Sequence, residues 1–223
     1  MGQYRISELN IEINTNSKTL LKNLQPYETT FDYKPNVVLS ITDDLLLQFM
    51  EEYDGYSADE VELEYITTEY NRSLFDFNGI SIRATGVQYD GCGVLFASPF
   101  EEKELYKNLP SKLTFAVNTP ALRLISTEFF VYDTPFGLHG DLSKEAKLPL
   151  KSIVFVDSNR FDSLKRLDTK DMVSMFMRSV MQSIHSDRTK HTLFMLEKIM
   201  KKVTFYGVSD LSDVKFILDR VTE

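Results

Sequence analysis

The chain has 223 residues, of which 43% are hydrophobic, and its formal net charge is −8 at pH 7. This composition can supply the core of an ordinary globular protein. The acidic balance argues against a protein that binds duplex nucleic acid, because such a protein needs a positive field to displace counterions. Cys92 is the only cysteine, which excludes a disulfide within the chain and cysteine-based zinc sites. We interpret it as a small packing residue, since no partner base is evident nearby.

The sequence contains no run of 18 apolar residues and no basic segment followed by an apolar one near its start. We therefore expect a cytoplasmic protein that binds neither nucleic acid nor membrane.

The first third of the chain predicts strands followed by two helices. Thr42 and Ser57 are suitable N-caps for these helices. Four glutamates of the second helix are interpreted as a solvated face, because no histidine lies nearby to complete a metal site; they are Glu60, Glu62, Glu64 and Glu69. The predicted elements are one or two strands over 3–14, a long polar connection over 15–35, a strand over 37–41, and helices over 43–52 and 58–77.

From Gly79 the pattern changes to short strands, so a soft boundary near residue 78 divides the chain into parts 1–78 and 79–223 of one compact unit. Asp90-Gly91 is a strong hairpin signal. The predicted strands cover 80–83, 86–89, 94–97, 113–117, 121–125, 129–132 and 153–157, with a short helix at about 101–108 and a turn-rich loop over 134–141.

The last third predicts helices over 169–186, 189–201 and 210–221, with a strand over 203–206. Methionines recur at helical spacing on the first two helices, and we expect them to fill the core. His185 and His191 are six residues apart, which is the wrong spacing for two ligands on one helical face, so they are interpreted as bystanders. Together these elements predict a mixed α/β fold with an N-terminal α/β segment and a helical C-terminal portion.

The stretch from residue 94 to residue 105 has the outline of a phosphate-binding site without its chemistry. A working loop reads G-x-x-x-x-G-K-[ST], with glycines that let backbone N–H groups surround the phosphates. Here three carboxylates stand at the expected helix start, where they would repel a triphosphate. Lys103 is interpreted as a surface ion-pair residue rather than a displaced phosphate lysine. The degenerate loop comprises Ser98, Pro99, Phe100, Glu101, Glu102, Lys103 and Glu104.

Five segments, taken in order and spacing, resemble the bacterial HPr kinase/phosphorylase family, and more closely its shorter relatives, over about residues 3–220. These segments are 75–79, 94–99, 120–124, 131–136 and 148–155. The resemblance implies a phosphoenolpyruvate-carboxykinase-like mixed sheet. It also implies an ancestry in phosphoryl transfer with ATP and Mg²⁺, and in some relatives a place beside peptide-maturation enzymes.

The resemblance also indicates which positions carry the chemistry in active members. Arg83 stands where the family usually has a histidine, and Asn118 follows Val117 where it has paired aspartates that act as base and Mg²⁺ ligand. Asn118 cannot take a proton at neutral pH. His139 and Asp141 lie where the family often places a basic residue. With loop, base and metal ligand all changed, we expect ATP and Mg²⁺ binding to be lost.

Three functions remain open. The first is a catalytically inactive member of the kinase fold that binds a protein or peptide, as a regulatory subunit of an active paralogue or a peptide-modifying enzyme, and that can also self-associate. The aromatic loop from Tyr132 to Leu138 is a candidate contact surface for it. The second is an enzyme with a rebuilt site, formed from Arg83, Asn118, His139 and Asp141, with Asp157 nearby. The third is nucleotide binding without transfer through Arg123, for which an ion pair with a nearby acid is the plainer interpretation.

Overall fold

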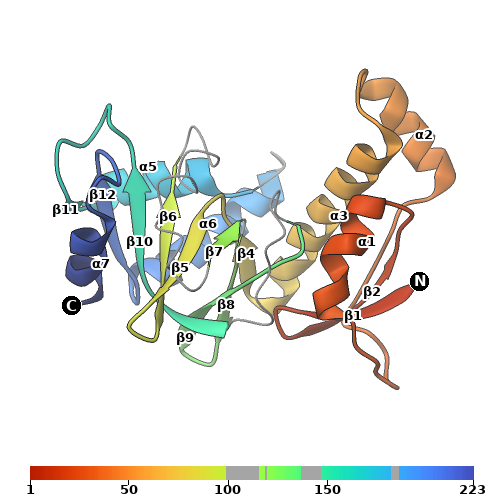
Figure 1. Cartoon of the computed structure of the whole chain (residues 1–223), viewed down its shortest axis with the longest axis horizontal. Helices are drawn as coiled ribbons and strands as arrows, with labels where there is room; N and C mark the ends of the chain where they lie inside the picture. The colour runs from red at the N-terminus through yellow and green to blue at the C-terminus, as the bar shows by residue number, and fades with distance from the viewer. Residues whose placement is uncertain (99–115, 119, 137–146, 182–185) are drawn as a thin grey trace.

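The computed structural model describes residues 1–98, 116–118, 120–136, 147–181 and 186–223 (Figure 1). Within these residues the strands form a three-stranded sheet and a nine-stranded sheet, and helices flank both. The predicted mixed α/β class is therefore confirmed.

The three-stranded sheet arises from the alternating residues at the start of the chain. β1 (Gly2–Ile6) pairs antiparallel with β2 (Leu9–Asn14), and β3 (Val37–Ser40) lies parallel to β2. The turn between β1 and β2 consists of Ser7 and Glu8, which both have left-handed backbones with φ of 52° and 61°. Such angles are unfavourable for residues other than glycine, so side-chain contacts must hold this turn in place.

The expected long connection over 15–35 is wrong, because it contains helix α1 (Lys18–Leu24) and the short 3₁₀ helix η1 (Gln25–Tyr27). Ser17 caps α1, since its hydroxyl accepts a hydrogen bond from the backbone N–H of Leu20 at 3.2 Å. Leu20 and Leu24 are fully buried. The sequence signal for this helix is short, because it consists of one cap and two leucines among polar residues.

Helices α2 (Asp43–Glu52) and α3 (Ala58–Leu74) begin where their caps predict. Ser57 and Glu60 form a reciprocal capping box at the start of α3. The helix ends three residues earlier than expected, and the 3₁₀ helix η2 (Phe75–Phe77) follows it.

The interpretation of all four glutamates of α3 as solvated is wrong for Glu62. This side chain is buried, and its carboxylate accepts a hydrogen bond from the backbone N–H of Asn16 at 2.8 Å. It thereby ties α3 to the end of β2.

The large sheet has the order β4-β8-β9-β10-β6-β5-β7, with β12 paired to β10 and β11 paired to β12. Asp90 and Gly91 form the predicted tight turn of the β5–β6 hairpin, with φ of 47° and 76°. The strands are β4 (Gly79–Ser81), β5 (Thr85–Tyr89), β6 (Cys92–Ala97), β7 (Ala116–Asn118), β8 (Ala121–Ile125), β9 (Glu128–Tyr132), β10 (Lys147–Val156), β11 (Lys165–Arg166) and β12 (Thr204–Val208).

Strand β10 joins two halves of this sheet. Its first residues, Lys147–Pro149, pair antiparallel with β9, and its last residues pair parallel with β6 and β12. A register shift between Leu150 and Ser152 separates the two pairings. The expected strand over 153–157 was the apolar second half of this longer element.

Helices cover both faces of the parallel half of the sheet. Along β6, Leu95 and Ala97 face the core that contains α5 (Thr169–Ser179) and α6 (Ser186–Met200), whereas Val94 and Phe96 face the core that contains α7 (Val214–Thr222). This alternation follows the two-residue period of a strand. The expected helix over 169–186 ends early because Val180 forms a bridge with Ile82 of the neighbouring segment. Met175 is fully buried, and Met172 and Met200 are partly buried against the same core, as the helical spacing predicted.

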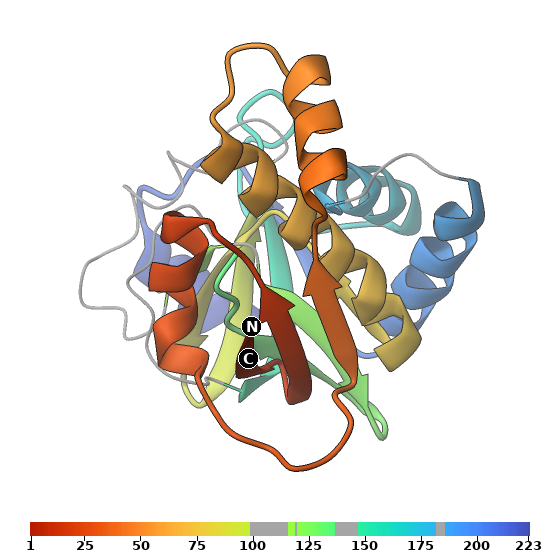
Figure 2. The ribbon, with the colours of Figure 1, turned by 90° about the vertical axis from the view of Figure 1, so that its right-hand side faces the viewer.

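The three-stranded sheet, α1, α2 and α3 lie together at one side of the molecule, and α7 lies at the opposite side (Figure 1). A shared apolar cluster joins the two parts. It includes Ile66 and Leu74 of α3, Tyr132 of β9 and Phe136. Figure 2 shows α2 and the segment after it extending away from the rest of the molecule.

Candidate functional site

The carboxyl ends of the parallel strands β6, β10 and β12 lie at one edge of the large sheet. Ligands commonly bind at this edge in α/β proteins. Ser98 follows β6 there and is half-buried, and Asp157 follows β10 and is buried. The Asp157 carboxylate accepts a hydrogen bond from the backbone N–H of Asn159 at 3.0 Å, which shapes the turn after the strand.

Much of the predicted site lies outside the described residues. This applies to Pro99, Phe100 and 101–104 of the degenerate loop, and to His139 and Asp141. Two other candidates, Arg83 and Asn118, are described. Asn118 on β7 pairs with Thr85 on β5, and Thr85 follows Arg83 by two residues, so the backbones of the two candidates belong to neighbouring segments.

One part of the predicted nucleotide site is described at this edge. The backbone position where the resemblance expects an aspartate pair is occupied by Val117 and Asn118 at the end of β7. In the described part of the chain, no group of three or more His, Cys, Asp or Glu side chains could hold a metal ion.

Arg123 serves the structure rather than a nucleotide. Its side chain is buried, and its guanidinium donates hydrogen bonds to the backbone carbonyls of Ser7 and Phe77, the latter at 3.3 Å. The expected ion pair with an acid is not present among the described residues. Arg123 instead links β8 to the strained β1–β2 turn and to η2.

The expected contact surface from Tyr132 to Leu138 is wrong over its described part. Residues 131–136 are all buried, and the ring of Phe136 packs against Tyr70 with centroids 4.4 Å apart. The aromatic residues of this loop therefore belong to the core that joins the two sheets.

A small polar pocket of about 160 Å³ lies under the β1–β2 turn. The Ser7 hydroxyl hydrogen-bonds the Tyr70 hydroxyl at 2.8 Å, and the Glu8 carboxylate accepts hydrogen bonds from Tyr132 at 2.7 Å and from Lys147 at 2.8 Å. Burial raises the pKa of Glu8, but these two hydrogen bonds outweigh it, so its pKa is lower than usual. The contacts explain how the strained turn is held.

Asp133 lines the same pocket and is almost entirely buried. Burial raises the pKa of its carboxyl group to about 7, although hydrogen bonds from Thr134 and Tyr27 stabilise the charged form and lower the pKa. The carboxyl group is therefore partly protonated at neutral pH. It lies where the three-stranded sheet and the large sheet meet.

A larger groove, of about 700 Å³, lies along α3. Residues of α3 from Glu60 to Arg72 line it, and among them Glu60, Glu64, Thr68 and Asn71 recur at the three- or four-residue spacing of one helical face. Phe75 of η2 continues the lining beyond the end of α3. Arg83 also lines this groove, with an exposed side chain, so the structure brings one predicted site residue to a place that the sequence did not indicate.

Aromatic rings form one wall of the groove. The centroid of Phe49 on α2 lies 5.7 Å from that of Tyr65 and 6.2 Å from that of Tyr53, which in turn lies 6.2 Å from that of Tyr56 in an edge-to-face arrangement. Tyr53 and Tyr56 are 53% and 60% exposed. None of the ten residues of α2 is buried. Apolar and aromatic surface is therefore available here to a partner.

The net negative charge of the chain lies mainly in the segment that supplies most of the residues lining this groove. Residues 43–74, which comprise α2, α3 and their connection, contain ten Asp or Glu and a single Arg, a net charge of −9. Because the whole chain carries −8, all other residues together carry +1. Two basic side chains line the groove: Arg72 in the last turn of α3, and Arg83 from the segment after β4.

Sequence reasoning missed this groove, although two signals were present. Residues 45–50 are mostly apolar on a helix with no obvious partner, and the acidic residues are strongly clustered. The glutamates of α3 were interpreted as a solvated face, and the apolar residues of α2 were given no role.

No protein-family model matches the chain, and no curated protein resembles it in sequence. Among the described residues, no helix is both long enough and apolar enough to cross a lipid bilayer.

Proposed function

We propose that this chain is a non-catalytic, HPr-kinase-like protein that binds a segment of a protein or peptide in the groove between α2 and α3. The observation that carries the proposal is the exposed aromatic wall of Phe49, Tyr53, Tyr56 and Tyr65. Aromatic side chains are enriched where proteins bind one another, because they bury a large area with few rotatable bonds. Helical grooves of this kind bind peptides through a few apolar anchor residues.

The dimensions of the groove suit this occupant. The lining extends from Glu60 on α3 to Phe75 at the start of η2, which corresponds to roughly 22 Å at about 1.5 Å per residue. An extended peptide of about seven residues spans the same length.

The sequence of the former phosphate loop supports the non-catalytic part of the proposal. Glu101, Glu102 and Glu104 replace the glycines and hydroxyl that a nucleotide needs, and Asn118 replaces a base. Phosphoryl transfer depends on positioning and charge neutralisation, and these residues offer neither.

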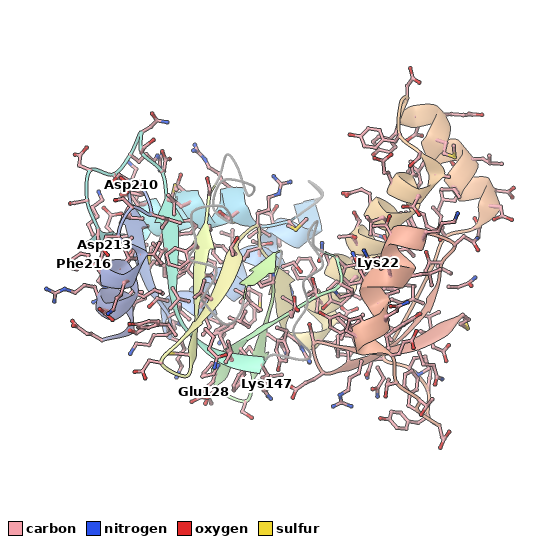
Figure 3. The ribbon with its side chains drawn as sticks, in the orientation of Figure 1. Lys22, Glu128, Lys147, Asp210, Asp213 and Phe216 are labelled. Atoms are coloured by element: carbon pink, nitrogen blue, oxygen red, sulfur yellow. The ribbon has the colours of Figure 1, made fainter. Side chains whose placement is uncertain are left out.

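The peptide-binding part is tested by selecting a displayed library of random peptides on the full-length chain. We expect enriched peptides to bind the wild type and to lose at least tenfold in affinity for the double variant Tyr53→Ala/Tyr56→Ala. Phe216→Ala is the matched control, because Phe216 is an aromatic residue of similar exposure, 49%, on α7, and Figure 3 labels it at the other side of the molecule. Peptides that bind the double variant as well as the wild type would overturn the assignment of the groove.

The non-catalytic part is tested by calorimetric titration of the chain with Mg·ATP. We expect no saturable heat. Binding in the micromolar range that Lys103→Ala abolishes would show that the loop still holds a nucleotide.

A further inference from the structure

The small polar pocket under the β1–β2 turn is lined by buried polar residues and by exposed charged ones. The buried residues are Ser7, Tyr27, Tyr132 and Asp133. The exposed residues are Arg5, Glu8 and Lys147, the last of which is labelled in Figure 3. The volume of about 160 Å³ has room for several water molecules, or for one organic molecule of a few heavy atoms.

The charged residues of this pocket balance in number, but only two of them pair with each other. Lys147 donates a hydrogen bond to the Glu8 carboxylate at 2.8 Å and forms an ion pair with it. Arg5 and Asp133 remain, and within the described part of the chain neither of them forms an ion pair. The pocket therefore has one cation and one carboxyl group that no oppositely charged side chain neutralises.

The missing counter-charge matters most at Asp133. Water solvates the exposed Arg5, whereas Asp133 is only 3% exposed. Its carboxyl group accepts hydrogen bonds from the backbone N–H of Thr134, at 2.8 Å, and from Tyr27. Hydrogen bonds alone compensate poorly for burying a carboxylate, so a small cation in the pocket would stabilise it.

The other residues of the pocket restrict what can accompany that cation. A carboxylate suits Arg5, because a guanidinium pairs with carboxylates through two parallel hydrogen bonds. None of the seven lining residues is aliphatic, so a branched apolar side chain would find little surface to pack on. A ligand that carries an ammonium group, a carboxylate and a very small or polar side chain fits both the charges and the volume.

We infer that this pocket binds a small zwitterion, an α-amino acid of the size of glycine, alanine or serine, with its ammonium group at Asp133 and its carboxylate at Arg5. The inference does not depend on the α2–α3 groove, because the two share no lining residue. Arg5 belongs to β1, whereas Tyr132 and Lys147 belong to the large sheet. The ligand thus binds where the two sheets meet.

Calorimetric titration of the full-length chain at pH 8 tests the class of ligand. We expect glycine, alanine and serine to bind with micromolar to millimolar dissociation constants, since a few heavy atoms supply limited binding free energy. Acetate and methylamine, which each carry only one of the two charges, should bind at least tenfold more weakly, and leucine should not bind. The inference is overturned if no amino acid binds, or if acetate, methylamine or leucine binds as tightly as glycine.

Two substitutions test the two ends of the ligand. Asp133→Asn and Arg5→Gln should each weaken glycine binding by at least tenfold. Arg178→Gln is the control for the second, because Arg178 is also exposed but lies on α5 and does not line the pocket. Thermal melts establish that each variant is folded, and since Arg5 is exposed, its variant tests the site even if Asp133→Asn is destabilised. Unchanged glycine affinity in either folded variant would overturn the assignment.

The pH dependence of binding gives a readout that a purely structural role of Asp133 would not produce. Because the pKa of Asp133 is raised to about 7 and the ammonium group requires the charged carboxylate, glycine should bind about tenfold more weakly at pH 6 than at pH 8. Glycine remains a zwitterion throughout this range. The other groups around Asp133 ordinarily titrate outside it; they are Arg5, Glu8, Tyr27, Tyr70, Tyr132 and Lys147.

Binding at pH 7 should also release a fraction of a proton, which calorimetry in buffers of different ionisation enthalpy measures. Asp133→Asn should abolish both the release and the pH dependence. Equal affinity of the wild type for glycine at pH 6 and pH 8 would overturn the placement of the ammonium group at Asp133.

Discussion

Helices α2 and α5 have similar lengths, caps and apolar spacing but opposite surroundings. Each is about three turns long, begins at a side-chain N-cap, Thr42 or Asp168, and has apolar residues at helical spacing. Yet α5 buries Met175 and Phe176 completely against the large sheet, whereas α2 buries no residue. An apolar helical face thus predicts that a surface needs a partner, but only the fold shows whether the chain itself provides one. Where it does not, as on α2, the uncovered face is the basis for the binding surface proposed above.

The largest expected effect is on stability and contrasts these two helices directly. Phe176→Ala should lower the free energy of unfolding by about 3–5 kcal/mol, because it leaves a cavity beside the ring of Phe205 in a closed core. Phe49→Ala on α2 should cost less than about 1 kcal/mol, since its ring is only partly covered. Urea denaturation measures both. Equal losses would mean that α2 is as much a part of the core as α5.

The second prediction concerns Asp133, at the junction between the part of the molecule that carries α2 and the large sheet. Its pKa is raised to about 7 in the folded chain from an ordinary value of 3.8, so between these two pH values the folded state binds more protons than the unfolded state. Stability should therefore fall as pH rises through this range, by up to about 1.4 kcal/mol per pH unit, and level off above pH 7.

Asp133→Asn should remove this decline, because an amide stays neutral throughout the range. Glu8, whose pKa is lowered, contributes the opposite slope only near its own titration at lower pH. Denaturation curves between pH 4 and pH 8 test the prediction, and a decline that persists in Asp133→Asn would assign it to another group.

The third prediction compares two glutamates of one helix. Glu62→Gln should cost about 1.5–3 kcal/mol, because the buried carboxylate accepts a charge-assisted hydrogen bond from the Asn16 backbone. Glu64→Gln, two residues later and exposed, should change stability by less than about 0.5 kcal/mol. Thermal melts of the two variants, measured side by side, give the difference. Indistinguishable melts would mean that Glu62 is solvated, as its sequence suggests, and that its hydrogen bond to Asn16 contributes little.

These examples show which parts of the fold can be predicted from the sequence. Local signals succeeded where one short segment decides the outcome: Thr42 and Ser57 start their helices, Asp90-Gly91 makes its hairpin, and strand β8 has the predicted bounds. They failed where a distant contact decides, as when Glu62 turns inward to Asn16, or when Val180 leaves its helix to pair with Ile82.

The candidate site was harder to predict from the sequence for the same reason. Arg83 is a candidate from sequence because the kinase family usually has a histidine at this strand position. Its side chain, however, lines a groove along α3, which only the tertiary structure brings to it. The raised pKa of Asp133 likewise depends on burial between elements distant in sequence. Whether the chain shares the phosphoenolpyruvate-carboxykinase-like fold, and whether residue 78 marks a domain boundary, remain predictions.

The smallest effect on stability is expected for the groove itself, and it completes the comparison of α2 with α5. Tyr53→Ala/Tyr56→Ala should change the free energy of unfolding by no more than about 0.5 kcal/mol per residue, because both rings are more than half exposed and contact mainly each other and Phe49. The same variant should lose the groove-bound peptide. A residue pair that contributes little to folding but is necessary for binding is expected of a contact surface, whereas Phe176→Ala should lower stability first and affect binding only through unfolding. If the tyrosine variant instead unfolds like Phe176→Ala, the aromatic wall is a structural element, and the explanation for the uncovered face of α2 must be sought elsewhere.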